Sequence, residues 1–402
     1  MKVVGIIAEY NPFHLGHKYH IDKIRETFGE DAVIVAVMSG NFTQRAEPAI
    51  FDKRERAEAA VLCGVDLVLE MPFPHCSSGA EFFAEAGVGI LNSLGVVDYI
   101  SFGSECADIS ALEKAASALE ASNLPSEESH DATGYAKRCE EIYRALYDDG
   151  DDIFKPNNIL GIEYIKALKK QGSSIIPTTV KRMGAEYNDD SISKCQLQSA
   201  KAIRALILKN DISAFDYVPK CAKDVYSRAI AQNEAPTYVS KLDAAVISFF
   251  RLNSPMLSEC DIHDCGGGLY NRIRSASFHT DSISSLIERS KTKKYTTARI
   301  RRAIWYSFFG VTSSDVRTVP KYTQILAMNT KGAALLKRIK KVSAFPILTK
   351  PSSKAALPQD AVREKELSDK ADSVFQLTKP RTVRGDAGLL FSPFVKKGDI
   401  PR

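Results

Sequence analysis

The sequence lacks an apolar run long enough to cross a membrane. Its longest such run, residues 32–38, is far shorter than the roughly 20 residues that a transmembrane helix needs. Lys2 is followed at once by an apolar pattern that leads into a polar loop, so we expect no signal peptide. There is also no internal repeat and no low-complexity tract. These absences argue against a membrane partner and favour a soluble globular protein.

Cysteine is present but forms no dense framework. The eight cysteines are scattered over 402 residues, so we expect reduced thiols in a cytoplasmic protein. Cys260 and Cys265 flank His263, but their spacing fits no standard zinc pattern, and we predict no metal site. The net charge of +5 is mild, so basic residues become informative only where they cluster.

Residues 1 to about 105 alternate short β-type runs with helical patterns. We predict strands over residues 3–8, 32–38, 65–69 and 96–102, and a further strand over 174–181 after a mainly helical stretch. The predicted helices cover residues 15–28, 51–63 and 78–94, with Arg54, Glu55, Arg56 and Glu58 on the solvent side of the second. This alternation predicts an α/β, Rossmann-like parallel sheet covered on both faces, with ligands beyond the carboxyl ends of its strands.

The alternation stops near residue 213, and helical patterns dominate from there. Residues 241–252 and 295–309 are amphipathic, and the segment from Pro351 is rich in Pro, Lys and Asp, which favours irregular structure. We therefore predict a sheet domain over residues 1–212 and a mainly helical region over 213–402 with an irregular tail.

The loop after the first strand is the strongest functional signal. His14 and His17 are three residues apart at the start of a helix, so they share one side of its first turn. Gly16 removes a side chain where a ligand has to approach. Backbone N–H groups, the helix dipole and two imidazoles suit an anion such as phosphate. Two solvated histidines at a helix start are the alternative.

A second candidate lies at the start of a later helix. Ser199 is suited to be its N-cap, and Lys201 and Arg204, three residues apart, could reach one polyanion. An ordinary capped helix with solvated basic residues is the alternative interpretation.

These motifs resemble a known family. His14-Leu15-Gly16-His17 is similar to the signature of the HIGH-motif nucleotidyltransferase superfamily. Glu9–His17, Met38–Arg45, Phe102–Glu105, Pro156–Tyr164 and Ser199–Arg204, in this order, resemble the bacterial tRNA(Met) cytidine acetate ligase family. That resemblance implies that acetate and ATP form acetyladenylate, and that the acetyl group passes to N4 of the wobble cytidine of elongator tRNA(Met). Mg²⁺ is expected with ATP, held largely by phosphate oxygens.

The resemblance also implies roles for individual residues. Catalysis is expected from His14, His17, Lys201 and Arg204. Acetate is expected to bind Asn41, Gln44 and Arg45, although a polar loop over the sheet edge is the alternative for this segment. Glu9 and Glu105 are loop carboxylates, and neither is identified as a general base. ATP is expected to contact Ile7, Ala8, Glu9, Tyr10, Asn11, Pro12, Phe13, His14, Leu15, Gly16, His17, His20, Gly103, Asn158, Arg182 and Ser199.

Two positions depart from the family pattern. Ala46 stands where the family usually has Gly, and Lys201 where it usually has Thr. Alanine argues against a backbone that needs positive φ at position 46, so the loop there is expected to adopt a different course.

A basic run lies between Arg289 and Arg302 and contains no acidic residue. Lys293, Lys294 and Arg299 are expected to bind tRNA phosphates, with Tyr295 as a stacking partner for a base. A solvated basic face is the alternative. Two other functions also stay open: adenylation of a small phosphate metabolite, and RNA binding without turnover by a protein with an ATP pocket.

Overall fold

A mostly parallel, eight-stranded sheet forms the centre of the molecule, with strand order β5-β4-β1-β2-β3-β6-β7 and β8 paired to β6. The computed structural model describes residues 1–122, 135–146, 153–182, 198–253, 261–343, 345–350, 357–381, 383–390 and 392–396. The strands are β1 Val3–Ala8, β2 Val33–Ser39, β3 Leu67–Met71, β4 Tyr99–Ser104, β5 Ile176–Lys181, β6 Thr323–Met328, β7 Ile347–Leu348 and β8 Phe394–Val395.

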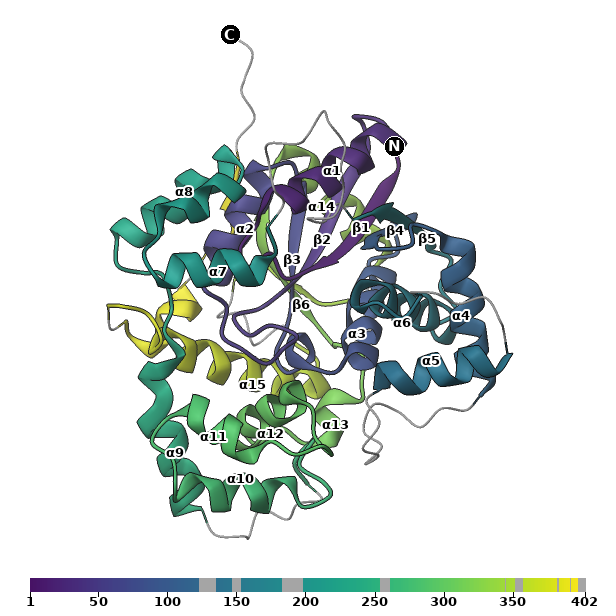
Figure 1. Cartoon of the computed structure of the whole chain (residues 1–402). Helices are drawn as coiled ribbons and strands as arrows, with labels where there is room; N and C mark the ends of the chain where they lie inside the picture. The colour runs from purple at the N-terminus through teal and green to yellow at the C-terminus, as the bar shows by residue number, and fades with distance from the viewer. Residues whose placement is uncertain are drawn as a thin grey trace.

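Helices cover both faces of this sheet (Figure 1). Those of the first half are α1 Leu15–Phe28, α2 Lys53–Leu62, α3 Ala80–Ser93, α4 Ile109–Ala121, α5 Tyr135–Leu146, α6 Pro156–Lys170 and α7 Ala200–Leu208. The second half contributes α8 Lys220–Ala231, α9 Asp243–Leu252, α10 Leu269–Ser277, α11 Ile283–Ser290, α12 Thr297–Phe309, α13 Ser313–Val316, α14 Thr330–Val342 and α15 Gln359–Gln376. Short 3₁₀ turns are η1 His75–Ser77, η2 Ile212–Tyr217, η3 Val239–Leu242 and η5 Gly385–Leu390.

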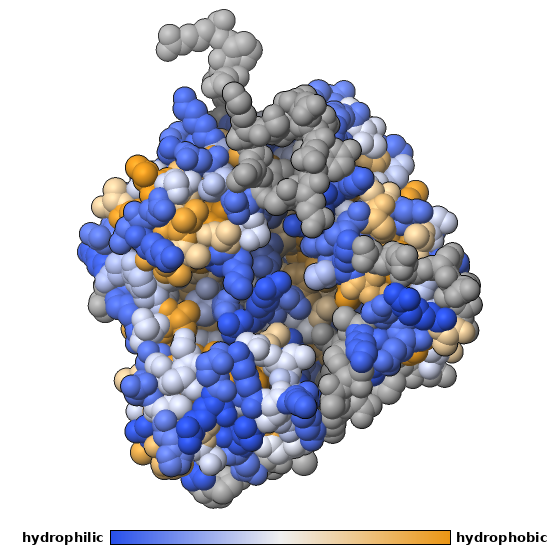
Figure 2. All heavy atoms as spheres, in the orientation of Figure 1, coloured by the Kyte–Doolittle hydropathy of each residue, from blue (hydrophilic) through white to orange (hydrophobic). Residues whose placement is uncertain are grey.

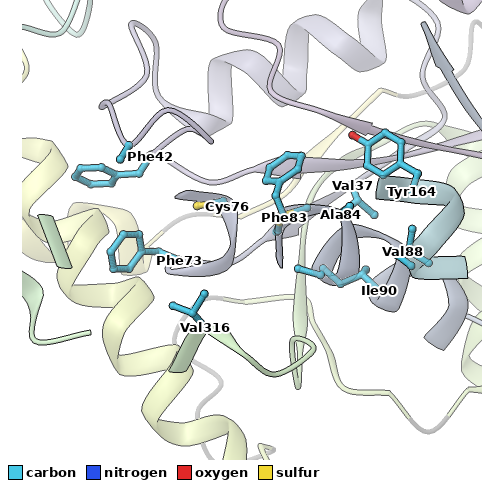
Figure 3. Close-up of a cluster of buried hydrophobic side chains, with 14 of the residues drawn as sticks. Val37, Phe42, Phe73, Cys76, Phe83, Ala84, Val88, Ile90, Tyr164 and Val316 are labelled. Carbon is cyan, nitrogen blue, oxygen red and sulfur yellow. The ribbon is translucent and has the colours of Figure 1, made fainter. Parts of the chain in front are cut away.

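The side chains of β2 divide the core into two layers. Val33, Val35 and Val37 pack with α3, α4 and α6, whereas the alternate residues of the strand pack with α1, α2 and α8. A strand that is buried on both faces is expected to be apolar throughout, as β2 is. The first layer extends beyond the sheet, and Figure 3 shows it passing from Val88 through Phe83 to Phe42 and Phe73.

The predicted alternation of strands and helices is confirmed, but the chain returns to the sheet after the helical region. β6 pairs antiparallel with β3, and β7 and β8 both pair with β6. The predicted division at residue 212 stays a prediction, although the sheet takes strands from both sides of it. The expected irregular tail is wrong for α15, whose buried residues, among them Leu367, Ala371 and Phe375, pack into the core.

The sequence predicts that the cysteines are reduced thiols, and this is wrong for one pair of them. Cys63, at the end of α2, and Cys221, in the first turn of α8, form a disulfide with Cα atoms 5.8 Å apart. The pairing follows from the packing of α2 against α8, which sequence spacing does not show. No helix among the described residues is long and apolar enough to cross a bilayer.

Arg56 was expected on the solvent side of α2, and this is wrong because its side chain is fully buried. Its guanidinium donates to the carbonyl oxygens of Phe51 at 3.0 Å, Glu9 at 2.6 Å and Ser39 at 3.2 Å, and also to that of Gly40. These oxygens belong to the loops after β1 and β2 and to the approach to α2. Arg56 therefore joins the segments that form the carboxyl edge of the sheet.

Replacing Arg56 with Met is expected to lower the free energy of unfolding by about 3 kcal/mol or more, because several buried carbonyl groups lose their donor. Urea denaturation of the purified protein measures this change. Arg228→Met is the matched control: Arg228 makes one exposed ion pair with Glu58 at 2.6 Å, whose loss is expected to cost less than about 1 kcal/mol. An equal loss of unfolding free energy in the two variants would contradict the structural role that we give to Arg56.

Candidate nucleotide-binding site

The candidate site lies where the strand order reverses. β2 and β3 lie on one side of β1, and β4 pairs with its other side. In doubly wound sheets, ligands bind outside the carboxyl ends of the strands at such a point. The loop from Ile7 to His20 starts at this end of β1, and Gly103 lies at the same end of β4.

The turn between β1 and α1 is held by two distant segments. Tyr10 has φ of 49°, and the Asn11–Pro12 peptide is cis. Oδ1 of Asn11 accepts from the Ile50 N–H at 2.9 Å, which ties the turn to the approach to α2. The Phe13 N–H donates to the Tyr226 hydroxyl of α8 at 2.8 Å.

His14 and His17 share the first turn of α1, as predicted, with ring centroids 3.8 Å apart. His14 is the N-cap, and its Nδ1 accepts from the Gly16 N–H at 3.0 Å. Nδ1 of His17 accepts from the His14 N–H at 3.2 Å. Because both Nδ1 atoms accept, each neutral ring carries its proton on Nε2. The two rings therefore supply two Nε2–H donors.

Gly16 is required by the neighbouring imidazole. A Cβ atom at this position would lie 2.9 Å from Cε1 and 3.1 Å from Nδ1 of His14. The sequence predicted a close approach here, and the approaching group in the free protein is the His14 ring.

The histidines of this site are neutral at physiological pH. Burial, together with the charges of Arg182 and Arg204, lowers the pKa of His14 to about 4. Burial and Arg182 likewise lower the pKa of His20 to about 4. The pKa of His17 is lowered well below its usual value, first by burial and then by the neighbouring His14. Fixed positive charge at the site thus comes from the arginines, and the imidazoles act as hydrogen-bond donors.

Two arginines from segments far apart in the sequence lie near enough to His14 to lower its pKa. Arg182 follows β5, and a Cβ atom on Gly103 would lie 2.9 Å from its Cγ, so glycine lets this side chain cross the end of β4. Arg204 of α7 donates from Nη1 to the Asn11 carbonyl at 2.8 Å. Ser199 is the N-cap of α7, as predicted. Lys201, the other basic residue of this helix start, is exposed. The hydrogen bond from α7 to the β1–α1 turn is made by Arg204.

The side chains of Asn158 and Glu105 each accept a hydrogen bond from the backbone N–H of the other residue, which joins the end of β4 to the start of α6. Oδ1 of Asn158 accepts from the Glu105 N–H at 2.8 Å and from the Cys106 N–H at 3.3 Å. The Glu105 carboxylate accepts from the N–H groups of Asn157 at 3.4 Å and Asn158 at 3.0 Å. Asn158 therefore shapes the loop beside Gly103.

The loop after β2 is held by its neighbours at both ends. Asn41 is buried, its Nδ2 donates to Asp372 of α15 at 2.9 Å, and its Oδ1 accepts from the Lys53 N–H at 2.7 Å. The Gln44 N–H donates to Oε1 of Glu9 at 2.7 Å, whereas the Arg45 side chain is exposed. Arg45 is consequently the predicted acetate ligand whose side chain is most accessible.

Position 46 corrects an expectation. Ala46 has φ of 52° and is buried, although alanine argued against a left-handed backbone. The Ala46 N–H donates to the Thr43 carbonyl at 2.8 Å, and packing and hydrogen bonding of the loop outweigh a local cost of about 1–2 kcal/mol.

The basic run divides into buried and exposed members. Arg299 and Arg302 are 7% and 6% exposed and pair with Asp264. Tyr295 is 8% exposed, and its hydroxyl donates to the Gly267 carbonyl. The predictions that Arg299 contacts phosphate and that Tyr295 stacks on a base stay predictions. In the free protein both side chains are buried and make contacts inside the helical region. Lys293 and Lys294 are exposed, as are Arg272, Arg289 and Lys291.

Sequence reasoning missed three residues that support the site: Arg56, Tyr226 and Asp372. Their partners lie far away in the chain, so no local spacing marks them. Charged neighbours surround Arg56 in the sequence, among them Glu55 and Glu58, so no local signal indicates its burial.

Among the described residues, no group of three His, Cys, Asp or Glu side chains is arranged to hold a metal ion. Cys260 lies outside these residues, so the spacing argument about Cys260 and Cys265 stays a prediction.

Comparisons with known proteins agree with this geometry. The family model of the HIGH nucleotidyl transferases matches residues 1–387. A tRNA(Met) cytidine acetate ligase of Acetivibrio thermocellus is 38% identical over 371 residues, which are 88% of this chain and 89% of that protein. One from Clostridium perfringens is 35% identical and covers 98% of this chain and all of its own. The crystal structure of Thermotoga maritima TmcAL bound with alpha-thio ATP has a TM-score of 0.87 at 31% identity, covering 99% of this chain and 100% of that one.

The lowered pKa of His14 predicts a loss of stability in mild acid. Its folded pKa of about 4 lies below the unfolded value of about 6.5, so the unfolded state binds more protons as pH falls between these values. From pH 7 to pH 5, this group is expected to remove up to about 2 kcal/mol from the free energy of unfolding. Urea denaturation at both pH values measures the change. His14→Asn keeps an N-cap acceptor and is expected to lose this part of the pH dependence; an unchanged dependence would contradict the prediction.

Proposed function

The chain belongs to the HIGH nucleotidyl transferase family and, within it, to the tRNA(Met) cytidine acetate ligases, and on this premise we propose that it activates acetate with ATP and acetylates N4 of the wobble cytidine of elongator tRNA(Met). The observation that carries the proposal is the convergence of two Nε2–H donors with Arg182 and Arg204 at the β1–β4 reversal. Such a site suits the triphosphate of ATP.

In the first step, an oxygen of acetate attacks the α-phosphorus, the bond to the bridging oxygen breaks, and pyrophosphate leaves. Charge grows on the phosphoryl oxygens in the transition state, and preorganised donors stabilise it without rearranging. His14 and His17 donate there as neutral rings, and Arg182, Arg204 and the flexible Lys201 supply positive charge. Mg²⁺ would accompany ATP and neutralise part of the phosphate charge, held largely by phosphate oxygens, since the described residues contain no group of three His, Cys, Asp or Glu side chains arranged to hold a metal.

Acetate binds beside the loop after β2 in this proposal. The exposed guanidinium of Arg45 is suited to a carboxylate. Asn41 acts through the loop, because its amide already bonds Asp372 and the start of α2. The Gln44 N–H holds Glu9, so the loop and the nucleotide segment are positioned together.

In the second step, the exocyclic amine of cytidine attacks the acetyl carbonyl, AMP leaves, and the amine loses a proton. Glu9 and Glu105 are the loop carboxylates that follow β1 and β4. Both oxygens of Glu105 accept hydrogen bonds at the start of α6, whereas Oε1 of Glu9 accepts one from the Gln44 N–H, so Glu9 is the better candidate to accept that proton.

Acetate-dependent exchange of pyrophosphate into ATP is the first test. We expect exchange with acetate and little without it, and N4-acetylcytidine in tRNA(Met) after incubation with ATP and acetate. Arg204→Gln is expected to lower the exchange rate at least about tenfold, because it removes charge from the transition state. Acetate-independent exchange, or exchange that requires a phosphate metabolite instead, would overturn the proposal.

Neutralising the exposed basic residues tests the RNA surface. The variant with Arg289, Lys293 and Lys294 all replaced by Gln is expected to weaken tRNA binding and to reduce the log–log salt slope by about 2–3. Acetate-dependent exchange is expected to persist. The matched control replaces Lys337, Arg338 and Lys341, which are exposed on α14. If this control weakens tRNA binding equally, the surface has no specific role.

A further inference from the structure

An ion pair joins the helical region to the loop beside the nucleotide site. Arg301 of α12 and Glu47 of the loop after β2 meet with Nη2 and Oε1 2.7 Å apart, and their side chains are 29% and 33% exposed. Arg299 and Arg302, on either side in the sequence, turn inward to Asp264. Arg301 is therefore the one of these three arginines that contacts the loop after β2.

Glu47 lies at the base of the turn that presents Gln44 and Arg45. Its carbonyl oxygen accepts from the Thr43 N–H at 3.0 Å and from the Thr43 hydroxyl at 3.1 Å. The next residue, Gln44, donates its N–H to Glu9. A displacement of Glu47 consequently acts on the loop that we assign to acetate.

Positive charge gathers around this ion pair. The electrostatic neighbours of Arg204 include Arg45 and Arg301 as well as the carboxylates of Glu9 and Glu47. Three guanidinium groups and two carboxylates thus lie close to one another beside the β1–α1 turn. A phosphate group is the ligand that such a partly neutralised cluster is suited to bind.

The basic surface leads directly to Arg301. Lys293 and Lys294 precede α12, which begins at Thr297, and four residues of helix advance about 6 Å to Arg301. Figure 2 shows hydrophilic side chains gathered over the lobe that contains α10, α11 and α12. A strand of RNA on this surface therefore has a short route to the nucleotide site.

We propose that a phosphodiester of the bound RNA replaces Glu47 as the partner of Arg301, so that this ion pair is exchanged when the acetyl acceptor docks. The inference rests on the proposed function, because it takes tRNA as the acceptor. Surface ion pairs contribute about 0–1 kcal/mol. Because this pair is half-buried, solvent still reaches both partners and compensates part of its loss. Arg301 binds the phosphate bidentately. Glu47 then has no ion-pair partner on α12, so the loop after β2 is free to adjust when the cytidine arrives.

Single substitutions of the two partners should have opposite effects on RNA binding. Arg301→Gln removes the phosphate contact, so the Kd for a tRNA(Met) transcript is expected to rise about fivefold or more and the salt slope to fall by about 1. Glu47→Gln removes the competitor, and the Kd is expected to fall about threefold. In the double variant, Glu47→Gln is expected to have no further effect, because the guanidinium that it would release is absent.

Filter binding or fluorescence anisotropy over a series of salt concentrations measures these changes. Arg228→Gln, which breaks the comparable ion pair with Glu58 at 2.6 Å, is the control and is expected to leave both Kd and slope unchanged. Acetate-dependent exchange, measured without RNA, checks separately that each variant activates acetate. Equal weakening by Arg301→Gln and Glu47→Gln, or an unchanged salt slope in Arg301→Gln, would overturn the exchange. A wild-type protein that binds tRNA but lacks acetate-dependent pyrophosphate exchange would instead overturn the proposed function.

Discussion

Carbonyl oxygens from three separate segments of the chain converge on the buried guanidinium of Arg56. Peptide carbonyls at the ends of strands have no ladder partner, and leaving several of them buried and unpaired costs more than one hydrogen bond returns. One planar side chain with five N–H groups satisfies several at once. The loops after β1 and β2 can therefore be irregular enough to carry function while their backbones stay close together.

The electrostatics of the site follow from the close packing of its side chains. Imidazoles that pack against each other and against Tyr10 and Phe13 lose hydration, and two nearby arginines disfavour their protonation further. The free site consequently carries its positive charge on guanidinium groups, which stay ionised when buried. A polyanion then meets fixed cations and oriented donors, without a change of protonation being required beforehand.

The sequence was sufficient to predict the parallel strands, the shared first turn of His14 and His17, and the Ser199 cap, because each depends on residues close together in the chain. It was insufficient for β6, whose short apolar run follows helices and pairs with β3 from far away. It also did not show that Arg56, Arg299 and Tyr295 are buried. Each is polar and lies in a segment with other polar residues, and the partners that draw it inward, such as Asp264 and Gly267, are not marked by spacing. Local patterns indicate which elements form, but not which charged side chains those elements bury.

The return of β6 to the sheet has a consequence for how the protein can be divided. A fragment that ends near residue 212 would contain β1 to β5, yet β3 would become an edge strand. Leu67, Val68 and Leu69 would keep their pairing with β2 but lose their partners on the side of β6. Those residues belong to an apolar run, and an exposed edge of this kind invites intermolecular strand pairing. β6, which lies within about the last eighty residues of the chain, thus covers an edge of the sheet that would otherwise favour aggregation.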